Sequence, residues 1–219
     1  KVTGFEVPYD YEDPTCTETA KRSDIAGIIM CQMDNGAYAK VLQGHLKCHL
    51  TWHRIYGNRG SVETLRHGDP ACIRVRKEPW DKAPDEPEER IYKPEFPEFH
   101  DVAARSGHGG GDFFMLHEFV RAIRTGEQPY LDIYTGLQMS CIGILAHRSA
   151  LEGNRTFDVP SFRDAQELRA WEGDNWSPDP QDAGPGQPPP SVLGQVTKAP
   201  GVRERFEQRA RELRPDYFQ

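Results

Sequence analysis

The tripeptide Asp34-Asn35-Gly36, which lies between two apolar segments, is the feature that most constrains how this chain folds. Its central residues tolerate the positive φ angles that a tight hairpin turn requires. Residues 25–33 (IAGIIMCQM) have the composition of a buried strand, and residues 37–46 (AYAKVLQGHL) return in the opposite direction. The sequence therefore predicts an antiparallel hairpin over 25–46.

Further strands are predicted within the first 80 residues. Residues 2–8 and 71–78 alternate between apolar and polar side chains, and residues 50–66 form two strands that are broken between Gly57 and Gly60. Together with the helices below, this pattern predicts an α+β fold. We expect one large, mostly antiparallel open sheet of about five or six strands, with helices packed on one face.

Helices are predicted after residue 106, beyond a charged, proline-punctuated loop over residues 79–106. In the first helix, Asp112 is the expected N-cap and Gly126 the expected stop. The second helix runs roughly over residues 135–151, and shorter elements follow: a strand over 155–160 and a helix over 161–173. The first helix carries one apolar stripe, which consists of Phe113, Leu116, Phe119, Val120 and Ile123. The inward side of the second consists of Leu137, Cys141, Ile144 and Leu145.

The composition along the chain divides it into three parts. Residues 1–174 are predicted to form the sheet-and-helix domain. Residues 175–200 are rich in Pro and Gly and are predicted to be a linker. Residues 201–219 are predicted to form a charged C-terminal helix.

Charge and cysteine usage exclude several classes of function. The net charge is −7 at pH 7, so the chain as a whole has no electrostatic attraction for nucleic acid. The longest apolar run, residues 25–31, is too short to span a membrane. Five dispersed cysteines without a CxxC spacing are typical of reduced thiols in a cytoplasmic protein.

A group of possible metal ligands occurs at His45, Cys48, His49 and His53. On a helix this spacing would stack the three imidazoles, as a zinc site requires. The surrounding pattern is strand-like, where even spacing only places the rings on one face, and no HExxH motif occurs. We therefore interpret the group as a polar sheet face and predict no metal site.

The segment GHGGGD, residues 107–112, is the strongest candidate for a functional site. It is not a dinucleotide fingerprint, because its glycines do not follow GxGxxG and no strand immediately precedes it. A glycine-rich turn that leads into a helix exposes free N–H groups. Asp112 would occupy some of these donors, which favours a neutral polyol over a phosphate. The alternative is a capped structural turn that carries an exposed histidine.

The sequence resembles the C-terminal domain of the glucose–fructose oxidoreductase, inositol dehydrogenase and MocA (Gfo/Idh/MocA) family. The resemblance rests on GHGGGDFF at 107–114, the DIY that follows at 132–134, and RTFDVPSF at 155–162. RSDIAGIIMCQMDNGAYAKV and HRIYGNRGSVE resemble the family's hairpin and strand pair. These motifs cover residues 1–165 in consistent order and are closest to the glycosidase-like branch, which includes α-N-acetylgalactosaminidases.

The resemblance implies the C-terminal substrate-binding and dimerisation portion of an NAD(P)-dependent sugar or polyol oxidoreductase, or of an NAD-dependent glycoside-transforming enzyme. It implies a catalytic role for His108 and substrate contacts at His108, Gly109, Gly110, Asp112 and Tyr134. The family's nucleotide-binding Rossmann domain and its EKP motif do not occur in this sequence. We therefore expect NAD or NADP to bind to a domain outside this chain, and this chain alone to be inactive.

Two further expectations concern partners and the glycines. We expect a sugar or polyol substrate and a homodimer or tetramer through the sheet, with contacts from Val41, Trp52, Ile55 and Val62. The alternative is a non-enzymatic interaction module that uses the open sheet face.

The glycines of residues 109–111 give a separate prediction. If they admit a ligand, Gly110→Val raises KM and leaves Tm nearly unchanged. If they are structural, Gly110→Val lowers Tm and leaves the kinetics unchanged.

Overall fold

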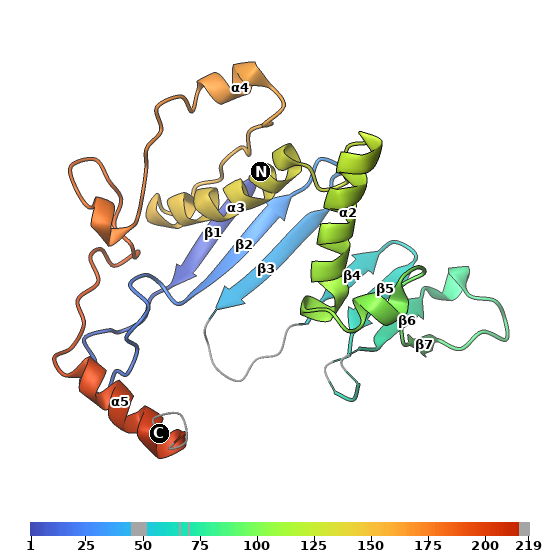
Figure 1. Ribbon diagram of the computed structural model, residues 1–219, viewed down its shortest axis with the longest axis horizontal. Coiled ribbons are helices and arrows are strands. Elements are labelled where there is room, and N and C mark those ends of the chain that lie inside the picture. Colours follow the sequence, from blue (N-terminus) through green and yellow to red (C-terminus); the bar gives the residue numbers. More distant parts are fainter. Residues whose placement is uncertain (45–51, 66, 70, 215–219) are drawn as a thin grey trace. The chain divides into compact units, whose positions relative to one another are not determined.

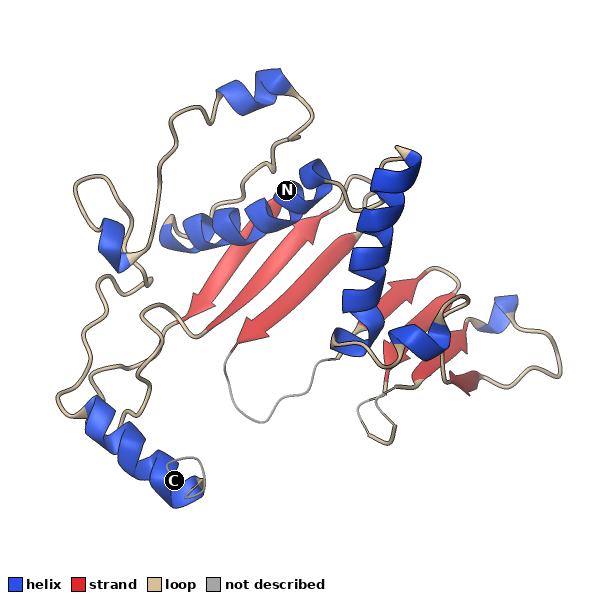
Figure 2. Ribbon diagram, viewed as in Figure 1, coloured by secondary structure: helices blue, strands red, loops and turns tan. Residues whose placement is uncertain are grey.

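The computed structural model describes residues 1–44, 52–65, 67–69 and 71–214. Its internal contacts divide the chain into two compact units. The first unit comprises Lys1–Leu46 and Leu131–Gln219, and the second comprises Lys47–Tyr130. Each unit contains both helix and strand (Figures 1 and 2), so the predicted α+β composition is confirmed.

The first unit is built on a three-stranded antiparallel sheet in the order β1 (Val2–Val7), β2 (Ala26–Gln32) and β3 (Tyr38–Gly44). The predicted hairpin connects β2 to β3. Gly36 has φ +83°, and the Met33 amide donates to the Ala37 carbonyl at 2.8 Å. The Asn-Gly turn thus sets the register of this hairpin, as expected.

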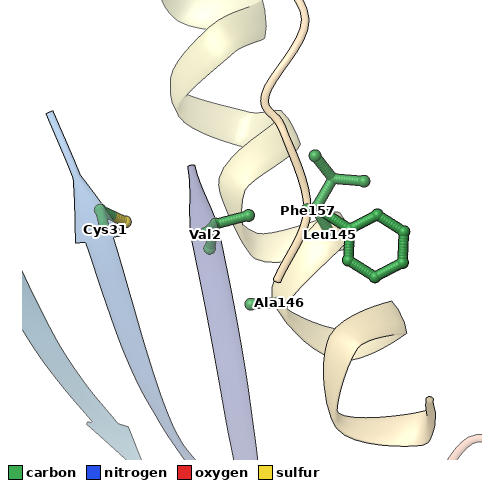
Figure 3. Close-up of a cluster of buried hydrophobic side chains, with 5 residues drawn as sticks. All are labelled: Val2, Cys31, Leu145, Ala146 and Phe157. Carbon is green, nitrogen blue, oxygen red and sulfur yellow. The ribbon is translucent and has the colours of Figure 1, made fainter. Parts of the chain in front are cut away.

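Helix α3 (Ile133–Leu151) packs against β1 and closes the core of the first unit. Figure 3 shows this core. Of the four residues predicted to face inward, Leu145 is buried, whereas Leu137 and Ile144 are exposed. Ala146 and Ser149 are buried instead, because the helix turns the face that contains them toward β1. The cluster consists of Val2, Cys31, Leu145, Ala146 and Phe157.

The closest approach between β1 and α3 occurs at Gly4. A Cβ atom at this position would lie 2.0 Å from the Ala146 carbonyl oxygen. The Gly4 amide donates to Ser149 Oγ at 3.0 Å, and Asn154 Nδ2 donates to the Gly4 carbonyl at 2.8 Å. The absence of a side chain at Gly4 therefore determines how closely α3 lies against the sheet.

The second unit contains a four-stranded antiparallel sheet in the order β4-β5-β6-β7. Within the described residues the strands thus form two sheets, which corrects the prediction of one large sheet. Strand β7 lies inside residues 79–106, which were predicted to be irregular. The strand was not predicted because its alternating pattern is only four residues long. The strands are β4 (Arg54–Gly57), β5 (Gly60–Thr64), β6 (Ile73–Lys77) and β7 (Glu89–Tyr92), with the short helix η1 (Pro79–Asp81) after β6.

Three helical elements complete the second unit: α1 (His100–Ala103), η2 (His108–Gly110) and α2 (Gly111–Thr125). Helix α2 ends at Gly126 in the left-handed conformation, as predicted. Its apolar stripe does not face a core: Leu116, Phe119 and Ile123 are 61%, 62% and 68% exposed.

The remainder of the first unit follows α3. The predicted strand 155–160 is reduced to one bridge, between Phe157 and Val2, and the predicted helix 161–173 to α4 (Ala165–Arg169). Residues 175–200 contain only η3 (Pro180–Asp182) as a helix, and α5 (Val202–Leu213) follows. None of the helices in the described ranges is both long and apolar enough to cross a membrane.

Candidate functional site

Three consecutive left-handed residues form the turn at the start of α2. His108, Gly109 and Gly110 have φ angles of +53°, +64° and +100°. A positive φ at a residue with a side chain is uncommon and often marks a functional site. Gly110 is the N-cap of α2, and Asp112 lies in the first turn without a capping hydrogen bond from its side chain. The prediction that Asp112 caps the helix is therefore wrong.

Asp112 instead pairs with His108. Its Oδ1 atom lies 2.8 Å from His108 Nδ1, and the imidazole is 86% exposed. The other carboxylate oxygen reaches back over Gly107, where a Cβ atom would lie only 2.3 Å from Oδ2. A carboxylate that holds one ring nitrogen selects the tautomer and orientation of the imidazole. The pair thus presents Nε2 to solvent in a defined orientation.

The glycines of this turn have different surroundings. Gly110 is buried, and a Cβ atom there would lie 2.7 Å from the Phe96 ring and 3.4 Å from Ala103 Cβ. Gly109 faces open space, since nothing lies within 4 Å of its Cβ position. Close packing therefore explains why position 110 is a glycine, whereas the space beside Gly109 is open to a ligand.

An aromatic cluster anchors the turn. Phe96 contacts Phe114 with 4.7 Å between ring centroids, and Phe99 contacts His117 at 4.9 Å. The rings of Phe113 and His117 are stacked at 5.7 Å. This cluster was not predicted from the sequence, because Phe96 and Phe99 lie in the segment predicted to be an irregular loop. Their recurrence in PEFPEFH was the available signal.

Tyr134 lies in the first unit, at the start of α3. The Arg163 guanidinium lies over the Tyr134 ring, with its carbon 4.8 Å from the ring centroid, and Arg163 also forms an ion pair with Asp132. Asp132 is the N-cap of α3 and accepts a hydrogen bond from the Thr135 amide at 2.8 Å. This hydrogen bond and the one from Arg163 lower the pKa of Asp132 to about 2. The His108–Asp112 pair, by contrast, lies in the second unit.

The start of α2 is a poor site for the pyrophosphate of a dinucleotide. A helix N-terminus attracts anions through its free N–H groups. Here the Asp112 carboxylate lies in the first turn, 44% exposed, and would repel a second anion. These residues do not fit NAD, and a neutral hydroxyl compound suits them better.

The candidate metal group is only partly described. His45, Cys48 and His49 lie outside the described residues. The His53 amide donates to Thr64 Oγ1 at 3.0 Å. Among the residues that the structure describes, no His, Cys, Asp and Glu side chains gather in a group that could hold a metal ion.

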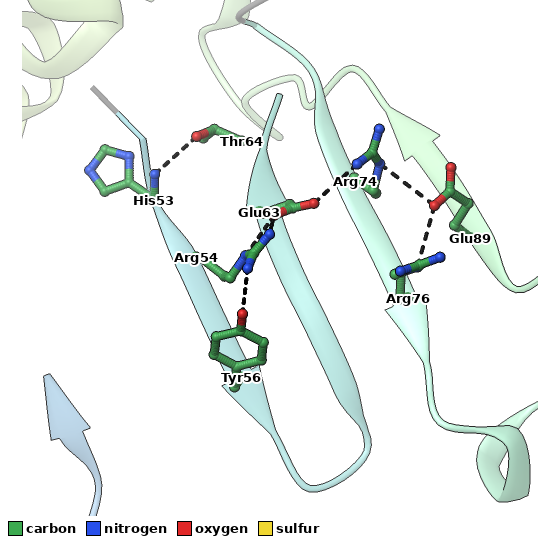
Figure 4. Close-up of polar contacts among 8 residues, drawn as sticks. All are labelled: His53, Arg54, Tyr56, Glu63, Thr64, Arg74, Arg76 and Glu89. Carbon is green, nitrogen blue, oxygen red and sulfur yellow. Dashed lines mark hydrogen bonds and ion pairs between the residues drawn. The ribbon is translucent and has the colours of Figure 1, made fainter. Parts of the chain in front are cut away.

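The four-stranded sheet has one charged and one apolar face. Figure 4 shows the charged face, where Glu63 lies between Arg54 and Arg74, and Glu89 between Arg74 and Arg76. Hydrogen bonds from Arg54 and Arg74 lower the pKa of Glu63. The other face, which we call the apolar face, carries Ile55, Val62 and Val75, which oppose one another across β4, β5 and β6, and it carries Arg90 opposite Val75 on β7.

This register places part of the contact surface predicted from the sequence. The Trp52 ring lies 4.5 Å from the Arg54 guanidinium, on the charged side. Val41 belongs to β3 in the first unit. Within the second unit, Ile55 and Val62 share one face of the sheet.

The fold matches the C-terminal parts of known oxidoreductases. Levoglucosan dehydrogenase, solved with NADH and L-sorbose, superposes with a TM-score of 0.55 and 20% identity, over 74% of this chain and 44% of that one. An Agrobacterium radiobacter oxidoreductase, solved with NAD+, L-tartaric acid and magnesium, gives a TM-score of 0.52 and 15% identity, over 72% of this chain and 42% of that one. The chain therefore shares the fold of the matched part of these oxidoreductases.

The match to a sequence family is more specific than the match to a fold. The model of the glycosyl hydrolase 109 C-terminal domain matches residues 48–168, just over half of the chain. The chain belongs to this family, and the resemblance found in the sequence is confirmed.

Curated relatives agree with this assignment. A family 109 glycosyl hydrolase of Stenotrophomonas maltophilia is 30% identical over 50% of this chain and 24% of its own length. The α-N-acetylgalactosaminidase of Tannerella forsythia is 34% identical over 29% of this chain and 14% of its own. The matched stretches thus span about a quarter or less of these relatives.

Proposed function

We propose that this chain is the substrate-site and assembly portion of an NAD-dependent enzyme that acts on a sugar or polyol, with glycoside transformation as the favoured reaction. The observation that carries the proposal is the exposed His108 ring, oriented by Asp112 beside the open space at Gly109. Membership of the glycosyl hydrolase 109 family supports a carbohydrate substrate. NAD, which supplies oxidation of a sugar carbon in this proposal, binds to another domain of the enzyme.

In the proposed mechanism His108 acts through Nε2. Asp112 accepts a hydrogen bond from Nδ1–H, so Nε2 carries a lone pair that accepts a proton from a sugar hydroxyl. The resulting imidazolium is stabilised by the adjacent carboxylate. Asp112 is therefore a positioning residue in this proposal. Tyr134 remains a proposed substrate contact, with its hydroxyl as the donor.

The proposed roles of His108 and Asp112 are tested in the intact enzyme with the variants His108→Gln and Asp112→Asn. We expect each to lower kcat roughly a hundredfold with little change in KM, because a positioned acid or base contributes at least this much. Steady-state kinetics give these quantities. His67→Gln, an exposed histidine of the same unit, is the control. Wild-type kcat in both pair variants would contradict the proposal.

We also propose that the apolar face of the four-stranded sheet forms the contact between copies of this chain. Ile55 is 67% exposed on this face, beside Val62 and Val75. An exposed apolar sheet face is a common oligomer contact. Ile55→Glu is expected to convert a dimer or tetramer to a monomer in light scattering, whereas Ser61→Glu on the charged face is not. A wild-type monomer at high concentration would contradict this assembly.

The exposed stripe of α2 favours a second candidate, a role as a protein-interaction module. Leu116, Phe119 and Ile123 form an apolar surface on the described helix. In that case the variants at His108 and Asp112 leave every activity of the intact protein unchanged. Polar substitutions in the stripe are then expected to abolish binding of a protein partner.

A further inference from the structure

A second histidine–carboxylate pair lies in the first unit. His147 Nδ1, on α3, lies 2.7 Å from Glu6 Oε1, near the end of β1. Their side chains are only 14% and 18% exposed. The proposed function of the chain does not use this pair.

A third ionisable group, Asp24, completes the cluster and joins it to the C-terminal part of the chain. Asp24 accepts hydrogen bonds from Ser191 Oγ at 2.6 Å and from the Val192 amide at 2.9 Å. Its charge also acts on both Glu6 and His147. We call residues 174–193 the arm. Asp24 thus holds the arm to the sheet while it repels the Glu6 carboxylate.

The arm also covers His147 directly. The Trp176 ring lies 5.5 Å from the imidazole, and the Pro189 carbonyl raises the pKa of His147. Next to it on α3, Arg148 pairs with Asp174 at 2.8 Å and lies over the Trp176 ring at 5.3 Å. The His147 side chain therefore lies between the sheet and the arm.

The charges around His147 come from three elements. Glu6 lies on β1, Arg22 and Asp24 precede β2, and Asp179 lies on the arm. These residues line an open hollow of about 690 Å³ that also includes His147, so protons reach the ring from solvent. Glu6 contacts the ring through a hydrogen bond, and the Pro189 carbonyl also acts on the ring as a hydrogen-bond acceptor.

We propose that Glu6, Asp24 and His147 form a protonation-controlled latch that fastens the arm to the three-stranded sheet and releases it when His147 loses its proton. With His147 protonated, one cation lies among two carboxylates. Without that proton, two neighbouring carboxylates remain in a half-buried site, and their repulsion acts on Asp24, the residue that holds the arm.

The directions of the pKa shifts agree with this device. Burial lowers the pKa of His147, but Glu6, the Pro189 carbonyl and Asp24 outweigh burial and raise it. Burial and Asp24 raise the pKa of Glu6 despite the hydrogen bond from His147. Both groups therefore bind protons more tightly in the folded state. The stabilisation from His147 is present below its ordinary pKa and is lost as the pH rises through the raised value.

Hydrogen–deuterium exchange of the 219-residue chain between pH 6 and pH 9, corrected for intrinsic rates, tests the latch. We expect protection of residues 176–193 to fall roughly tenfold across this range, the size of effect that loss of one charge-assisted hydrogen bond produces. Protection of β2 is expected to stay constant. The Ala199 amide, which donates to the Tyr11 carbonyl at 2.8 Å, should also stay protected.

Variants distinguish release of the arm by His147 from a loss of protection that has another cause. His147→Gln keeps a donor for Glu6 without titrating and is expected to abolish the pH dependence, whereas His67→Gln should retain it. Glu6→Gln removes one carboxylate and is expected to keep the arm protected at pH 9. Should His147→Gln fail to fold, Glu6→Gln decides alone. Constant protection of the wild-type arm, or a pH dependence that persists in these variants, would overturn the proposal.

Discussion

Gly4→Ala is expected to destabilise the first unit by about 3 kcal/mol or more, because one added methyl group overlaps the backbone of α3. The Cβ position lies 2.0 Å from the Ala146 carbonyl oxygen and 2.5 Å from its carbonyl carbon. Backbone atoms cannot rotate away as a side chain does, so α3 must move from β1. That movement also weakens the hydrogen bond from the Gly4 amide to Ser149.

Urea unfolding followed by circular dichroism measures this loss. The matched control is Gly27→Ala on the neighbouring strand β2, where the nearest atom to the new Cβ is the Phe5 carbonyl oxygen at an ordinary 3.4 Å. Since Ala is favoured over Gly within a strand by roughly 0.5–1 kcal/mol, this control is expected to be neutral or slightly stabilising. Equal unfolding midpoints for the two variants would show that the contact between β1 and α3 is misplaced.

Gly110→Val is expected to destabilise the second unit by roughly 2–5 kcal/mol. The left-handed backbone at φ +100° contributes strain, and the side chain overlaps the Phe96 ring, which Phe114 holds in place. This expectation replaces the one drawn from the sequence, which had Tm nearly unchanged, because the buried position of Gly110 was not evident there. Thermal unfolding of the two variants Gly110→Val and Gly109→Val gives the comparison.

Gly109→Val adds the same side chain at a positive φ but meets open space. We expect it to cost only the backbone strain, roughly 1–3 kcal/mol. Phe96→Leu in the Gly110→Val background is expected to recover part of the additional loss, as a double-mutant cycle would reveal. If both valine variants unfold at the same temperature, Phe96 does not limit the space at Gly110. In the intact enzyme, Gly109→Val is now the variant expected to raise KM.

Elements that local chemistry specifies were predicted well. The turn at Gly36 and the end of α2 at Gly126 both appear where glycine supplies a positive φ. Alternation and turn signals located β1, β4, β5 and β6, because side chains on successive strand residues point to opposite faces, and apolar composition located β2. These features depend on residues that are close in the sequence, so the sequence alone determined them.

Contacts between distant residues were beyond such reasoning. His108 and Asp112 were both identified, yet their pairing depends on the left-handed turn and on the carboxylate reaching back over Gly107. The link between Asp24 and Ser191 joins residues 167 positions apart, in a segment predicted to be a linker. Neither the periodicity of a helix nor the alternation of a strand encodes these contacts.

For this protein the sequence by itself determined the class of fold, the family and the turn that carries the candidate site. The tertiary structure alone decided that the described strands form two sheets, that the stripe on α2 is exposed, and that Gly110 is held by Phe96. The physical reason is that local propensity acts over a few residues, whereas burial and close packing depend on which distant segments the folded chain brings together.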